Sequence, residues 1–496
     1  MIIRYDRYVT KSILIVFLVC VNSLFINNPT ASGIIAMIEM ITLFFAALFC
    51  DIDVLFKMLL VFMSCGIENQ YYATGGRTSE FFSFYKLPIG GIYPFFVIVM
   101  IALIRCYFKY GIVLPIKSSQ NNRFFFYTLS VVMAVLAFPM TILTIFLNDN
   151  GILYLSEMWK YNARDAYQMI VIMALMVLFF HSYYNNREIV GEIKELLLML
   201  LSCMCLAAVI LILMKNYYIN WGAEKVLSCP LLFFFSPGLV LFVYEKRGLY
   251  YLLAGCLSLI IQMKYTVGIA GTWWLYVIGV FVVFLKIILE TKSDYRKWLL
   301  SVALLVLAMI GLWFFIGSGY ITSVNGQISY KLNTIIKYAT GIGSIHRSVS
   351  STSASISARI EEIVNVFLEF AHKPYFVLMG KGYGGTVRKY WGLSNWNRST
   401  TSTFPLVMIT NRVYSAFHIA VAEVIINYGL LGLIHFAYLF ILFLANVIKR
   451  NGSMWIVIGF LWYALFYSLF YSFDVGIIFI CCGLVDTHKY SFRREK

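Results

Sequence analysis

Residues 415–432 read SAFHIAVAEVIINYGLLG, and they decide how the fold is interpreted because they join the only long polar segment to a strongly apolar run. Apolar side chains recur there three and four residues apart, as they do on one face of a helix. We therefore expect a helix here, with His418 in its first turns. A histidine at the mouth of an apolar helix is the first candidate functional residue.

The composition is typical of an integral membrane protein and excludes an ordinary soluble domain. Of 496 residues, 61% are hydrophobic and 12% are charged, and the mean hydropathy is +0.82. Repeated apolar runs fit helices that cross a hydrocarbon core of about 30 Å better than the alternating pattern of a barrel. We expect an all-α polytopic bundle of about 14 transmembrane helices with one long, partly helical periplasmic loop. The predicted spans are 12–27, 33–50, 54–67, 89–108, 124–147, 167–184, 196–214, 229–244, 249–263, 267–289, 298–317, 415–447, 454–470 and 474–488.

Charge asymmetry orients these spans. With a cytoplasmic N-terminus, the inside segments collect 22 Lys and Arg and the short outside loops collect seven. The positive-inside rule then predicts a multi-pass membrane protein with both termini cytoplasmic. This divides the chain into helices 1 to 11 (1–317), a periplasmic loop that carries the site (318–414) and helices 12 to 14 with a basic tail (415–496). The ten cysteines show no metal spacing, so neither a disulfide framework nor a zinc site is expected.

The long loop 318–413 is basic. It holds ten Lys and Arg against only Glu361, Glu362 and Glu369. An outward basic surface suggests an anionic partner, such as lipid head groups, a phosphate or pyrophosphate sugar carrier, or an acidic glycan. The alternative is a solvated loop with incidental charge.

Within this loop, residues 359–370 have helical spacing and Pro374 ends the helix. Arg359 lies in its first turn, off the apolar stripe. It is either a surface arginine paired with Glu362, or a guanidinium that grips a phosphate bidentately.

A glycine turn follows at 378–386, LMGKGYGGT. Backbone amides around Gly380, Lys381, Gly382 and Gly384 could cradle a phosphate, although the spacing is neither a P-loop nor a dinucleotide fingerprint. Three aromatic residues then offer either flat faces to a sugar or anchors at the membrane interface. They are Tyr390, Trp391 and Trp396.

Two further arginines and the other histidines complete the candidates. Arg412 precedes His418 by six residues, and Arg164 lies in the predicted outside loop 148–166, where solvation is the simpler interpretation. His418 alone would be read as a helix-end histidine sharing a hydrogen bond. His346, His372 and His435 lack a matching context and keep that structural interpretation.

The order of these features resembles the O-antigen polymerase and O-antigen ligase superfamily: many helices, a late periplasmic loop with an arginine-bearing helix, a G-x-G turn, then a histidine followed by GxxG. The matching pieces are Arg359, residues 380–384, His418 and residues 429–432. Two departures are Ile419, where the family commonly has a polar residue, and the absence of an arginine-ten-glycine pattern.

The resemblance implies a metal-independent glycosyl transfer without a cofactor, at the periplasmic face of a bacterial inner membrane. The donor would be an undecaprenyl-pyrophosphate-linked oligosaccharide. In the polymerase the acceptor is another lipid-linked repeat, and in the ligase it is the lipid A core. It implies His418 and Arg359 as catalytic residues, with Arg412, Arg164 and the glycine turn binding pyrophosphate. Membrane lipids and a chain-length regulator protein would be partners, and nucleic acid would not.

The helix count favours the polymerase over the ligase. A lipid-linked oligosaccharide flippase also reaches about fourteen helices, but such transporters normally show two similar halves, short loops and charges in a central cavity. This chain has one long loop and no visible halves.

Overall fold

The computed structural model describes residues 2–25, 29–65, 94–111, 121–147, 155–215, 217–219, 225–227, 240–241, 354–392, 412–414, 417, 420–449, 452–465 and 473–494, with scattered positions between 257 and 306. Over these ranges the chain is predominantly helical, which agrees with the all-α prediction. In this described part, β-structure is limited to two short antiparallel ribbons.

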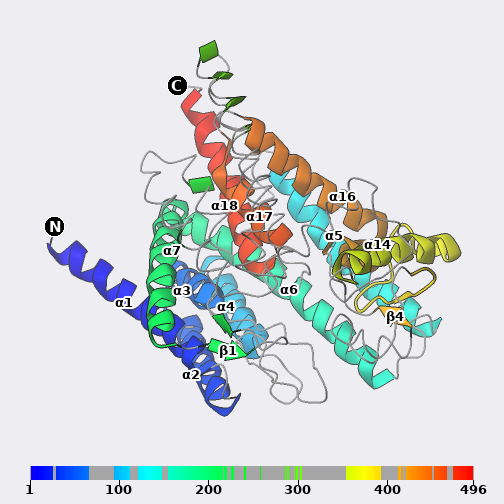
Figure 1. Ribbon diagram of the computed structural model, residues 1–496, viewed down its shortest axis with the longest axis horizontal. Helices are drawn as coiled ribbons and strands as arrows, with labels where there is room; N and C mark the ends of the chain where they lie inside the picture. Colours follow the sequence, from blue (N-terminus) through cyan, green and yellow to red (C-terminus); the bar gives the residue numbers. More distant parts are fainter. Residues whose placement is uncertain are drawn as a thin grey trace.

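Among the described residues, seven helices form the N-terminal part of the bundle (Figure 1). α1 packs against α7, and α4 contacts both α2 and α6. α3 also contacts α6, where the rings of Phe56 and Phe179 lie 5.6 Å apart. The bounds are α1 (Ile2–Leu24), α2 (Pro29–Phe49), α3 (Ile52–Cys65), α4 (Pro94–Tyr110), α5 (Asn121–Phe146), α6 (Leu155–Asn185) and α7 (Ile189–Leu213). The ribbon β1 (Tyr217–Ile219) and β2 (Lys225–Leu227) follows α7.

The described C-terminal part contains α16 (Ala420–Ile448), α17 (Met454–Leu465) and α18 (Phe473–Arg494). α17 packs mainly against α18. α16 lies antiparallel beside α5, because Phe126 near the start of α5 contacts Tyr438, whereas Met140 near its end packs with Ile425. The end of α5 and the start of α16 are therefore at the same end of the bundle.

The described helices overlap in sequence with the first seven predicted spans, from 12–27 to 196–214, and with the last three predicted spans. Three of them are long and apolar enough to cross a membrane: Phe125–Phe146, Ile189–Leu213 and Val421–Ile448. The spans predicted at 229–244, 249–263, 267–289 and 298–317 fall almost wholly outside the described residues. The number of about 14 transmembrane helices therefore stays a prediction.

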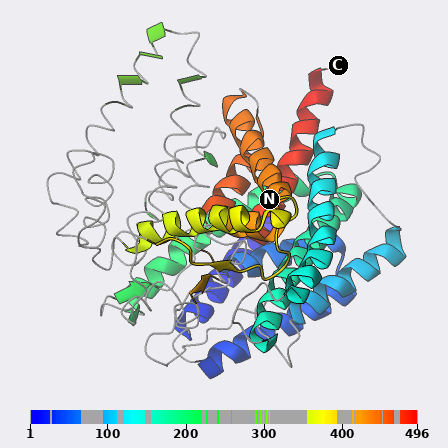
Figure 2. The ribbon, with the colours of Figure 1, turned by 90° about the vertical axis from the view of Figure 1, so that its right-hand side faces the viewer.

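The long loop contributes α14 (Ala354–His372), the 3-10 turn η3 (Pro374–Phe376) and the ribbon β3 (Val387–Arg388) with β4 (Val413–Tyr414). The helix predicted at 359–370 is present and begins five residues earlier. It runs across α16 and α5 rather than along them (Figure 2). A small core joins the loop to both helices, with members from α5, α14 and α16.

Candidate functional site

The polar face of α14 points into the protein. Glu361, Glu362, Asn365 and Glu369 have no exposed surface. Buried carboxylates are costly unless they are paired and hydrogen-bonded. The contacts of these side chains with the rest of the loop therefore organise the site.

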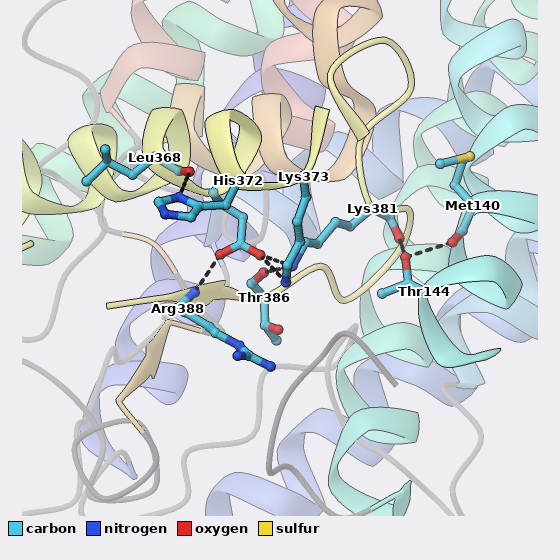
Figure 3. A network of polar contacts seen from close by, with 9 residues as sticks. Met140, Thr144, Leu368, His372, Lys373, Lys381, Thr386 and Arg388 are labelled. Atoms are coloured by element: carbon cyan, nitrogen blue, oxygen red, sulfur yellow. Dashed lines mark hydrogen bonds and ion pairs between the residues drawn. The ribbon is translucent and has the colours of Figure 1, made fainter. Parts of the chain in front are cut away.

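Glu369 lies at one end of this buried polar cluster, where it is bonded to Lys373, Lys381 and Arg388; Figure 3 shows these three partners. The Oε1 atom of Glu369 accepts from Lys381 Nζ at 2.6 Å and from Lys373 Nζ at 2.8 Å, while Oε2 accepts from the Arg388 amide at 3.0 Å. Burial acts to raise the pKa of Glu369, but the Lys381 charge and these hydrogen bonds outweigh it and hold the pKa below its ordinary value. Lys381 Nζ also donates to the carbonyl of Thr386 at 2.8 Å. The ion pair thus ties the glycine turn to α14.

Asn365 and Glu361 form the other end of the cluster. The Asn365 side chain donates to the carbonyl of Trp391 at 2.7 Å and accepts from the amides of Tyr390 and Trp391 at 2.7 and 2.8 Å. Glu361 pairs with Lys389 Nζ at 3.0 Å and accepts from the Tyr414 hydroxyl. Together these contacts hold the ribbon β3–β4 against α14.

Gly429 breaks α16 at the level of the glycine turn. Its φ of 60° and ψ of −141° are not helical, and the helix resumes after it. In an unbroken helix the amides of Leu430 and Leu431 would donate to the carbonyls of Ile426 and Asn427. Here all four groups bond to the loop instead.

Four hydrogen bonds between the loop and α16 replace the two that are missing within the helix. Non-helical backbone between apolar helices is tolerated when its polar groups are paired within the protein. Two loop carbonyls accept from α16 and two loop amides donate to it. The pairs are Leu430 N to Val377 O (2.8 Å), Leu431 N to Leu378 O (3.3 Å), Lys381 N to Ile426 O (2.7 Å) and Gly382 N to Asn427 O (3.0 Å).

The turn docks equally closely on α5. The Tyr383 amide donates to Thr141 Oγ1 at 2.7 Å, and Thr144 Oγ1 donates to the carbonyl of Lys381 at 2.7 Å. A Cβ on Gly382 would lie 2.4 Å from the Thr141 amide nitrogen, and the φ of Gly382 is +78°. Glycine is required at this position for both reasons.

These contacts revise the role predicted for the glycine turn. The amides of Lys381 and Gly382 are already bonded to α16, and the Lys381 side chain is fully buried against Glu369. Gly380 and Gly384 are buried as well. In this conformation the turn fastens the loop to the bundle and offers no open cradle to a phosphate.

The structure describes the side chains of only some of the other predicted site residues. Arg412 is exposed at the start of β4, with a φ of 51°, and Tyr390 and Trp391 are exposed beside α14. Arg359 belongs to α14 and Arg164 to α6, but their side chains lie outside the described part of the structure, as do Trp396 and His418. The roles proposed for these residues stay predictions.

Histidines without a predicted role make structural contacts. His372 hydrogen-bonds the carbonyl of Leu368 at 2.7 Å and stacks on Tyr390, with ring centroids 4.5 Å apart. His435 is buried, 3.1 Å from Ser130 Oγ. Within the described residues, no three His, Cys, Asp or Glu side chains gather closely enough to hold a metal ion.

Sequence reasoning missed Arg388. This exposed arginine is the last residue of β3. The next residue, Lys389, donates its backbone amide to the carbonyl of Arg412 at 2.9 Å. Burial lowers the pKa of Lys389, and the nearby Arg412 charge acts in the same direction while Glu361 opposes it. Only the ribbon pairing, which no local pattern indicated, brings Arg388 of β3 near Arg412, the residue that directly precedes β4.

Comparisons with known proteins returned no match to a family model, to a curated protein or to a solved structure.

Replacing Gly382 by alanine should destabilise the protein by roughly 2 kcal/mol or more, because the new Cβ meets backbone of α5 and a left-handed φ becomes strained. Gly191 in α7 is the matched control. Its Cβ position is open, so Gly191→Ala should be neutral or gain up to about 1 kcal/mol of helix propensity. Thermal unfolding of the purified variants measures both, and equal midpoints would contradict the close docking of the turn.

Proposed function

We propose that this chain is a membrane glycosyltransferase of the O-antigen polymerase type. It would transfer an undecaprenyl-pyrophosphate-linked glycan onto the non-reducing end of another lipid-linked repeat, at the periplasmic face of a bacterial inner membrane. The proposal rests on the resemblance of the motif order, and the geometry of the loop supports it.

The observation that carries the proposal is the exchange of hydrogen bonds across Gly429. It fastens the glycine turn to α16, the helix that begins two residues after His418. The ion pair of Glu369 with Lys381 fastens the same turn to α14, the helix that contains Arg359. α14, the glycine turn and α16 therefore form one packed unit. Arg359 belongs to α14, and His418 precedes α16 by two residues in the sequence.

The distribution of charge also suits a pyrophosphate substrate. All three acidic residues of the segment 318–413 are buried, and Glu361 and Glu369 are paired with lysines. Arg388 and Arg412 are exposed. An outward surface that keeps its arginines and buries its carboxylates attracts anions.

The proposed reaction uses a histidine as the base and arginines as partners of the leaving group. The acceptor hydroxyl attacks the anomeric carbon of the donor, the bond from that carbon to the pyrophosphate oxygen breaks, and the acceptor proton passes to His418. Arginines neutralise the charge that develops on the leaving pyrophosphate, so that no metal is needed. Arg359 and Arg412 are the proposed partners, with Arg164 as a further one.

The relative arrangement of the helices fits the predicted topology. Because α5 and α16 are antiparallel, the loop after α5 and the loop before α16 leave the bundle at the same end. The predicted periplasmic segments 148–166 and 318–413 lie at these two helix ends, although α6 begins at Leu155 and so takes up most of the first segment. Arg164 and His418 would then be on the same side of the membrane.

Deleting the gene should leave cells whose lipid A core carries a single repeat unit, because ligation continues while polymerisation stops. Electrophoresis of the extracted lipopolysaccharide measures the repeat number. Bare core with accumulated lipid-linked polymer would instead indicate the ligase, and an unchanged ladder would contradict both enzymes. Return of the ladder with the wild-type gene on a plasmid is the control.

A further inference from the structure

The outward side of α14 is apolar. Ile360, Ile363 and Phe367 are exposed, Phe367 to 58%, and their spacing puts them on one face of the helix. The opposite face holds the buried carboxylates of Glu361 and Glu369. A helix on a water-soluble domain normally shows the reverse pattern.

This apolar face continues onto a candidate membrane span. Val377 and Leu378, at the foot of α14, are exposed to 41% and 54%. Their carbonyls accept from Leu430 and Leu431 of α16, so the two segments lie side by side. On α16 the exposed apolar residues next to this junction are Leu430, Leu433 and Ile434.

The junction lies within the depth of a bilayer. Leu430 follows the start of the span Val421–Ile448 by nine residues, which is roughly 14 Å along a helix. The span is 28 residues long, or about 42 Å, and exceeds a hydrocarbon core of about 30 Å by only about 6 Å at each end. Val377 and Leu378 are therefore at the level of acyl chains if this span crosses the membrane.

Charge and orientation agree with a position at the membrane boundary. Between residues 354 and 392, no carboxylate with a described side chain is exposed, while Arg388 is. Tyr375 and Trp391 are also exposed, and aromatic residues of this kind are enriched at the boundary between lipid and water. α14 also runs crosswise to α16 and α5, as a helix lying in the membrane plane would (Figure 2).

We propose that the apolar outer face of residues 360–378, formed by Ile360, Ile363, Phe367, Val377 and Leu378, is immersed in membrane lipid. α14 is then an interfacial helix whose polar side closes the buried cluster and whose apolar side contacts acyl chains. This inference requires the bundle to be in a membrane and is independent of the glycosyl transfer.

Photo-crosslinking in native membranes tests this contact. The photoreactive residue p-benzoylphenylalanine replaces Phe367, Leu378 or, as a control that is exposed outside the apolar face, Arg388 in the full-length chain. After illumination, mass spectrometry identifies the adducts. We expect phospholipid adducts at positions 367 and 378 in several-fold excess over position 388.

The other outcomes overturn the proposal. Adducts at 367 and 378 with peptides of the same chain would show that another segment covers the face. Adducts with a second copy or with another protein would show a protein interface. No lipid adducts at 367 and 378, or adducts there no more abundant than at 388, would show that lipid does not preferentially cover this face. Using two positions guards against the failure of one variant to fold.

Discussion

Glu369→Gln should weaken docking of the glycine turn more than any other single side-chain change in the loop, by about 3–5 kcal/mol. Lys381 has no exposed surface. Without the carboxylate of Glu369, its buried ammonium group loses this ion pair, although it still donates to the carbonyl of Thr386 and still lies over the ring of Phe376. Hydrogen exchange of the Lys381 and Gly382 amides measures the effect, because both donate to α16 only while the turn is docked.

Lys373→Met is the matched control, because Lys373 pairs with the same oxygen of Glu369 but is partly exposed. Its loss should cost about 1 kcal/mol or less. Adding Lys381→Met to Glu369→Gln should recover part of the loss, since the buried charge that lost its carboxylate is then removed. Equal protection of the amides in Glu369→Gln and Lys373→Met would contradict the role given to the buried pair.

Acid should weaken the same docking. The pKa of Glu369 is held below its ordinary value in the folded protein, so its contribution is fully present above the unfolded pKa. The contribution is lost as the pH falls through the lower, folded pKa. We therefore expect the Glu369→Gln penalty to shrink progressively below about pH 4, where an unfolded glutamate becomes protonated, and to vanish only below the lower pKa of the folded protein. A penalty that does not change over this range would mean that the carboxylate charge is not what holds Lys381.

His418→Ala should lower the rate of glycan transfer by roughly 10²- to 10⁴-fold, because a general base typically contributes that much. The variant should still reach the membrane in normal amounts. The measurement is the initial rate of chain growth by purified protein on lipid-linked repeats extracted from the deletion strain.

His372→Gln is the control for His418→Ala. His372 lies in the loop that precedes His418, but its ring is engaged with the carbonyl of Leu368 at the end of α14. We expect its transfer rate to remain close to wild type. A His418→Ala variant as active as the His372 variant would remove the proposed proton transfer.

The helices themselves were predictable from the sequence. Apolar runs indicated α5, α7 and α16 with ends within about seven residues, because a span must be long and apolar whatever it packs against. α14 was also predicted, from its spacing and from Pro374. These features depend on local sequence alone.

The packing of the loop was not predictable in the same way. The sequence indicated an apolar stripe on α14 but not which side of the helix is buried. The buried side is the opposite one, which carries Glu361, Asn365 and Glu369, since their partners come from residues 12 to 53 positions away. Similarly, the glycines at 380 and 382 suggested an open phosphate cradle. Their need for glycine comes from close contact with α16 and α5, which only the tertiary structure reveals.

Chain growth by the wild-type protein in liposomes tests the central claim most directly. Supplied only with lipid-linked repeats extracted from the deletion strain, it should produce a ladder of longer lipid-linked glycans, with no added metal and in the presence of a chelator. If folded protein leaves every repeat at its original length, or extends it only when lipid A core is supplied, the chain is not a polymerase.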